Sequence, residues 1–116
     1  DGIRDRDVPG VQTCALPICR AIAERARIRA LYAKLAGQAD AAVTLSASGA
    51  APVGFATTGD PTFAVPSSLL GVPAITLPAL ADQGLPLGLQ IVGFEQADAV
   101  LFSAALWLRD LVMKQA

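Results

Sequence analysis

The carboxy-terminal two thirds of the sequence carry very little charge, and this limits what the chain is able to fold into. Residues 1–40 hold twelve of the nineteen charged residues, which leaves seven for the 76 residues from Ala41 to Ala116. A domain of this size keeps a large share of its surface in water, and so few charges cover such a surface poorly. We therefore expect Ala41–Ala116 to pack against further protein.

The length and the net charge restrict the number of domains and the class of partner. A chain of 116 residues is long enough for one small domain. Its formal net charge is -1, which gives no basic surface for a phosphate backbone. The sequence predicts a single domain with no nucleic-acid partner.

An uncharged stretch from Pro61 to Ala81 is long enough to cross a bilayer as a helix. Four prolines recur within it, and each would interrupt the helix that a lipid environment requires. We therefore predict no membrane segment. Charged residues from Asp1 to Asp7 also interrupt any signal-peptide core, so the expected location is cytoplasmic.

The two cysteines, Cys14 and Cys19, predict no metal site. The chain contains no histidine, and nothing else in it completes a zinc-binding set with these two residues. Two cysteines are also too few for a disulfide framework. The spacing therefore predicts that both are thiols.

The first eighteen residues, DGIRDRDVPGVQTCALPI, have neither helical nor strand periodicity. They resemble a peptide that arises when a sequencing adapter is translated. We expect residues 1–18 to be unstructured and of artefactual origin, and residues 19–116 to form the domain.

Beyond this segment the pattern predicts two main helices. Ile28, Leu31, Tyr32 and Leu35 form an apolar stripe on a helix that starts at Arg20 and stops near Gly37. A second stripe predicts a helix from Asp98 to about Lys114; its residues are Leu101, Ala104, Ala105, Leu108, Leu111 and Val112.

Short strands and a long loop are expected between the two helices. Strands are predicted at Ala41–Leu45, Ala74–Leu77 and Leu87–Val92. The last two are expected to pair as a hairpin, with a turn at Asp82-Gln83-Gly84 in which Gly84 has a positive φ. Residues 46–66 form a long loop rich in small residues, of the kind that lines a cleft. Ser67–Leu70 then reads as one helical turn closed by Gly71.

The residue types exclude several common hydrolytic sites. Without histidine, a Ser-His-Asp or Cys-His arrangement has no base. No Gly-x-Ser-x-Gly elbow or glycine-rich phosphate loop occurs. Lys34 and Lys114 are expected to be solvated, and the pair Ser67-Ser68 lacks the glycines that would expose a nucleophile. No catalytic residue is predicted in this chain.

Several motifs in a fixed order, spread over Asp40–Val92, resemble one enzyme family. A strand and an Ala-Pro loop are followed by Thr-Gly-Asp-Pro at residue 58, Leu-Leu-Gly-Val-Pro-Ala at residue 69 and Gly-Leu-Pro-Leu-Gly-Leu-Gln-Ile-Val-Gly at residue 84. This order resembles the closing section of amidase-signature enzymes. The resemblance extends over Arg20–Ala116.

The resemblance implies an α/β fold in which helices flank a large mixed β-sheet. It also implies a Ser, cis-Ser and Lys triad that cleaves linear amides through an acyl-enzyme, and that triad lies outside this chain. The closing section would supply strands and part of the wall of the substrate cleft, with contacts from Thr58, Gly59, Asp60, Phe63 and Ser67. The alternative is structural: Gly59 and Asp60 shape a turn, Phe63 anchors the loop, and Ser67 caps the short helix.

Two functional hypotheses follow. In the first, the chain is the carboxy-terminal section of an amide hydrolase and is inactive alone. Its partners are the missing amino-terminal half of the domain and a small amide substrate, and the parent enzyme requires no metal or organic cofactor. In the second, it is a non-catalytic packing or interaction module that folds on a partner, as its apolar faces would allow.

Overall fold

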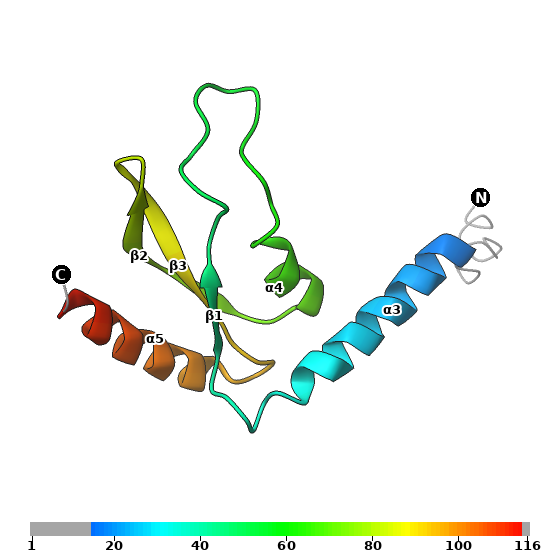
Figure 1. Ribbon diagram of the computed structural model, residues 1–116. Coiled ribbons are helices and arrows are strands. Elements are labelled where there is room, and N and C mark those ends of the chain that lie inside the picture. The colour runs from blue at the N-terminus through cyan, green and yellow to red at the C-terminus, as the bar shows by residue number, and fades with distance from the viewer. Residues whose placement is uncertain (1–14, 115–116) are drawn as a thin grey trace, which may run out of the picture.

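The structure is a computed structural model that describes residues 15–114. Three helices and three strands follow one another in this part of the chain (Figure 1). They are α3 (Leu16–Ala33), β1 (Ala42–Leu45), α4 (Val65–Leu70), β2 (Ala74–Asp82), β3 (Leu85–Val92) and α5 (Asp98–Met113). The predicted α/β composition of three strands, two main helices and a long loop is confirmed.

The strands form one antiparallel sheet in which β3 lies between β1 and β2. Gln90 in β3 is in register with Thr44 of β1 and with Thr76 of β2. The predicted hairpin of β2 and β3 is confirmed. The described strands pair only in antiparallel fashion, so the mixed sheet implied by the family resemblance stays a prediction for a larger domain.

Strand β2 is longer than its sequence pattern predicts. It runs through Pro78 to Asp82, with a register shift between Leu77 and Leu80. Proline removes a backbone donor, and this is tolerated on a strand that has a neighbour on one side only. The turn into β3 contains two residues with positive φ, Gln83 at 52° and Gly84 at 79°. Gly84 was predicted to have this conformation, whereas Gln83 was not.

Helix α5 packs on one face of the sheet and makes the core with it. Ile91 of β3 is buried together with Leu101 and Ala105 of α5. Gly93 allows this close approach, because a Cβ at that position would lie 3.1 Å from the Leu101 side chain. The predicted helix is confirmed, although Leu111, assigned to its apolar stripe, is 41% exposed.

The opposite face of the sheet contacts the long loop through Gln90. This side chain is 7% exposed, and its Nε2 donates to the Phe63 carbonyl at 2.9 Å and to Thr44 Oγ1 at 3.3 Å. A buried amide without such partners would be costly. Gln90 therefore fastens the end of the loop to the central strand.

Helix α3 extends away from the sheet (Figure 1) and is attached through its middle and its carboxyl end. The Tyr32 ring stacks on Phe94 with centroids 4.9 Å apart, and its hydroxyl donates to the Gly93 carbonyl at 3.2 Å. Arg25 Nε donates to the Leu69 carbonyl at 2.7 Å. Burial raises the pKa of Tyr32, which keeps the phenol in its donating form. Leu31 and Leu35 of the predicted stripe stay exposed.

The amino-terminal boundary of α3 corrects part of the sequence prediction. Residues 16–18, expected to be unstructured, form the first turn of α3, which therefore crosses the expected domain boundary after residue 18. Pro17 does not prevent this, because amide groups in the first turn of a helix have no helical acceptor. The remainder of the adapter-like segment, residues 1–14, lies outside the described residues.

Cys19 also departs from the prediction, since it is disulfide-bonded and not a thiol. Spacing along the chain does not decide such a bond; the positions of the Cα and Cβ atoms do. Cys14, the other cysteine for which a thiol was predicted, lies outside the described residues.

The uncharged stretch Pro61–Ala81 contains loop, the short helix α4 and most of β2, and not one long helix. Within residues 15–114, none of the helices has the length and apolar character needed to cross a membrane.

Candidate functional site

A polar hollow of about 220 Å³ lies between the long loop and the start of β3. Three of the predicted cleft residues, Thr58, Gly59 and Asp60, line it together with the chain just after β1 and with Pro86–Gly88 of β3. The loop and β3 are far apart in the sequence and are brought together because the loop returns across the start of β3. The structure thus gathers part of the predicted site at one place.

The turn at Asp60 is held by its own side chains. Thr62 donates to Asp60 Oδ1 from its hydroxyl at 2.6 Å and from its backbone amide at 2.9 Å. The Thr62 hydroxyl first, and then the amide, hold the pKa of Asp60 below its usual range. Gly59 has a φ of 98°, which suits glycine. Asp60 is therefore an exposed, ionised acceptor at the rim of the hollow.

Asp82 fixes the other side of the loop and was not predicted to do so. Its Oδ2 accepts a hydrogen bond from the Ala50 amide at 2.7 Å. Gly49 passes so close that an added Cβ would lie 3.0 Å from the same oxygen. The sequence pattern placed Asp82 in the β2–β3 turn, and nothing in it indicated a contact 32 residues away. Asp82 thus joins the loop to the sheet.

Phe63 and Ser67 do not line this hollow. The Phe63 side chain is half-buried, and its carbonyl is the acceptor for Gln90. Ser67 lies inside α4, where its hydroxyl donates to the Ala64 carbonyl at 3.2 Å. The helix cap is Ala64 without a side-chain hydrogen bond, so the alternative reading of Ser67 as the cap is wrong. The helix starts two residues earlier than predicted because proline suits its first turn.

The side chains at the hollow suit hydrogen bonding and not nucleophilic attack. Hydroxyl groups come from Ser46, Ser48 and Thr58, and a carboxylate comes from Asp60. No lysine is among the lining residues, and both lysines of the chain have exposed side chains elsewhere. An unactivated hydroxyl is a weak nucleophile. The arrangement supports binding of a polar group.

The described residues contain no group of three or more histidine, cysteine, aspartate or glutamate side chains placed to hold a metal ion.

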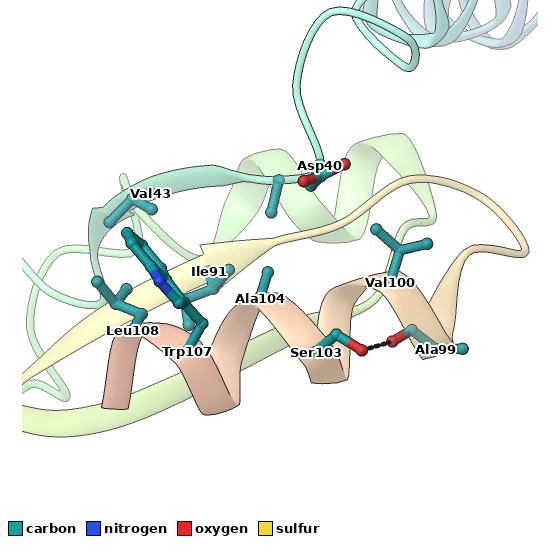
Figure 2. A pocket seen from close by; sticks show the side chains of 10 residues that line it. Asp40, Val43, Ile91, Ala99, Val100, Ser103, Ala104, Trp107 and Leu108 are labelled. Carbon is teal, nitrogen blue, oxygen red and sulfur yellow. Dashed lines mark hydrogen bonds between the residues drawn. The ribbon is translucent and has the colours of Figure 1, made fainter. Parts of the chain in front are cut away.

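A larger hollow lies on the opposite face of the sheet, between α5 and β1 (Figure 2). It has a volume of about 700 Å³. The side chains of Trp107 and Val43 enter it from the two sides, and Ile91 lies at its floor (Figure 2). We call it the α5–β1 groove.

Comparison with known proteins gives matches over parts of the chain. The chain is 47% identical over 49 residues to the A subunit of glutamyl-tRNA(Gln) amidotransferase of Zymomonas mobilis, and the match covers 41% of this chain and 10% of that protein. It is 43% identical over 54 residues to a fatty acid amide hydrolase of Oryza sativa subsp. indica, covering 46% of this chain and 9% of that protein. Both relatives are amidase-signature proteins. The resemblance to the amidase-signature family is confirmed.

A longer match is found with the A subunit of glutamyl-tRNA(Gln) amidotransferase of Granulibacter bethesdensis. The two proteins are 40% identical over 94 residues, and the match covers 69% of this chain but 19% of that protein. The chain therefore spans less than a fifth of the length of these amidase-signature relatives. No family model matches the chain, and no solved structure matches it.

Proposed function

We propose that this chain is the carboxy-terminal section of an amide carbon–nitrogen hydrolase of the amidase-signature family. In the complete enzyme, a Ser, cis-Ser and Lys triad from another section would form the acyl-enzyme with a small linear amide. This section would supply sheet strands and a wall of the substrate cleft, and would be inactive alone. The observation that carries the proposal is the 40% identity over 94 residues with one amidase-signature relative.

The exposure of apolar side chains supports the need for a further section. Phe102 and Trp107 of α5 are 60% and 66% exposed. Apolar area of this kind costs free energy in water and is normally covered. The observation fits a section of a larger domain.

The polar hollow supports a role in the cleft wall. Thr58, Gly59 and Asp60 offer a hydroxyl, a backbone turn and a carboxylate around one space, and these groups suit hydrogen bonds to the polar part of an amide. Phe63 and Ser67 do not line the hollow, but we include both in the proposed wall. The end of the loop next to them is hydrogen-bonded to β3, because Gln90 donates to the Phe63 carbonyl. Substrate contact by these five residues is part of the proposal.

The test is a chimera in which this chain replaces the matched section of the Oryza sativa subsp. indica fatty acid amide hydrolase. We expect the chimera to release fatty acid from a fatty acid amide, and the 116-residue chain alone to release none. Asp60→Asn in the chimera should raise KM several-fold with little change in kcat, because a hydrogen bond to a charged group is lost. Asp98→Asn at the start of α5 is the matched control and should leave KM unchanged.

Two results would overturn the proposal. One is amide turnover by the chain alone that disappears in Ser67→Ala or Ser68→Ala. The other is a chimera that folds but releases no fatty acid, which would favour the alternative of a non-catalytic interaction module that folds on a partner.

A further inference from the structure

The α5–β1 groove is the open side of the protein's own core. Its floor includes Ile91, which is 1% exposed. Ala41 and Leu108 also line the groove, and both pack against the cluster of Ile91, Leu101 and Ala105. Whatever fills the groove therefore extends this core.

The sides of the groove are apolar and uncovered. Trp107, Val43 and Val100 are 66%, 53% and 43% exposed, and each lines the groove. Asp40 is the one charged side chain among the lining residues. A pocket for a small molecule of similar volume encloses most of its ligand, whereas these walls stand largely in solvent. The groove fits an apolar surface of another polypeptide segment.

The position of α5 on the sheet indicates what kind of segment is absent. Helix α5 packs on β2 and β3, and β1 lies beyond β3 at the sheet edge. Within residues 15–114, none of the helices packs closely over the face of β1 that carries Val43, which is 53% exposed. Helices that cover a sheet lie side by side in one layer. The uncovered strip beside α5 suits one further helix.

The geometry points to the α5–β1 groove as the seat of an apolar helix from the remaining part of an amidase-signature domain, packed beside α5 across β1. This inference rests on the proposed function. The chain spans less than a fifth of its amidase-signature relatives, so a complete domain has ample sequence to supply the helix. The groove then serves domain assembly, and substrate binding belongs to the polar hollow on the other face.

Fluorine labelling of Trp107 tests the assignment, because it is the only tryptophan in the sequence. The chain is produced with 5-fluorotryptophan and combined with the unlabelled Granulibacter bethesdensis amidotransferase protein from which the matched section has been removed. The solvent isotope shift of the fluorine resonance, measured between H₂O and D₂O, reports exposure of the indole. We expect a large shift for the chain alone and its loss in the complex.

Each of the other outcomes of the fluorine experiment contradicts either the groove assignment or the proposed function. A complex in which Trp107 keeps its solvent isotope shift overturns the groove assignment and leaves the proposed function standing. If the two proteins form no complex, the proposed function is contradicted and the groove has no proposed occupant. Loss of the shift in the chain alone with rising concentration identifies a second copy as the occupant, and loss on addition of a free fatty acid amide identifies a small ligand.

A matched pair of helix variants gives an independent readout. Ala104→Glu places a carboxylate in the groove, where it stays hydrated in the free chain and is buried by the incoming helix. We expect the complex to weaken at least ~10-fold, because an unpaired buried charge is costly. Ala30→Glu makes the same change on an exposed face of α3 and should alter the dissociation constant less than about twofold. Equal effects of the two substitutions would overturn the groove assignment.

Discussion

Individual residues of β3 decide how closely the loop and α5 approach the two faces of the sheet. The buried Gln90 amide needs hydrogen-bond partners, and the Phe63 carbonyl and Thr44 Oγ1 are its acceptors. The strand pattern placed Gln90 and Ile91 on opposite faces. It did not show that one face meets a helix and the other the loop, because this depends on contacts between distant segments.

Gly88 shows the same dependence and gives a test at the scale of one residue. A Cβ at this position would collide with the side chains of Ser46 and Thr76. We expect Gly88→Ala to destabilise the fold by about 1–3 kcal/mol, as overpacking does. The measurement is the urea midpoint of the chain, followed by circular dichroism.

Gly54→Ala is the control for Gly88→Ala. Gly54 has open space around its Cα but a φ of 86°, so alanine there costs backbone strain of about 1 kcal/mol without a collision. A midpoint for Gly88→Ala equal to or above that of Gly54→Ala would show that Ser46 and Thr76 move aside at little cost.

Helices and turns with a strong local sequence pattern were predicted well. Features that depend on contacts with distant segments, such as the length of β2 and the packing of α3, were not. The stripe of α5 and the left-handed closure of α4 at Gly71, with φ 68°, follow from residues near in sequence. The extension of β2 through Pro78 does not, because it requires pairing with β3. Likewise, α3 is held by Tyr32 on Phe94, a contact that its apolar stripe alone did not specify.

The β2–β3 hairpin provides a prediction at the scale of an element. Gln83 and Gly84 both have positive φ, as the two central residues of a type I′ turn require, and Asn-Gly is the preferred pair there. We expect Gln83→Asn to stabilise the hairpin by about 0.5 kcal/mol and Gln83→Val to destabilise it. Cα secondary shifts of β2 and β3 in increasing urea measure both changes. A higher midpoint for the valine variant would contradict the turn assignment.

For the whole molecule, the described fold leaves much of its apolar surface without cover. The fully buried large side chains are Ile91 and Leu101, and the walls of the α5–β1 groove are exposed. A small core of this kind contributes little stability. The expectation that the segment packs against further protein, drawn from the scarcity of charge after residue 40, stays a prediction.

A dye-binding experiment tests this expectation. The chain alone should bind an anilinonaphthalene dye strongly and self-associate, since exposed apolar patches do both. Combination with the truncated Granulibacter bethesdensis protein should reduce the dye fluorescence several-fold. That truncated protein, measured by itself, serves as control for its own dye binding. A chain that binds no dye and stays monomeric at high concentration would refute the expectation.

The sequence by itself determined the element order, the hairpin, the α5 helix and the amidase-signature resemblance, because these depend on periodicity, turn residues and motifs within short stretches. It also placed Thr58, Gly59 and Asp60 in one turn. Only the tertiary structure decided that this turn meets Pro86–Gly88 and that Asp82 holds the loop. It also decided that α5 packs on β2 and β3 and leaves Val43 of β1 exposed. Those features depend on the packing of segments far apart in the chain, which no local pattern encodes.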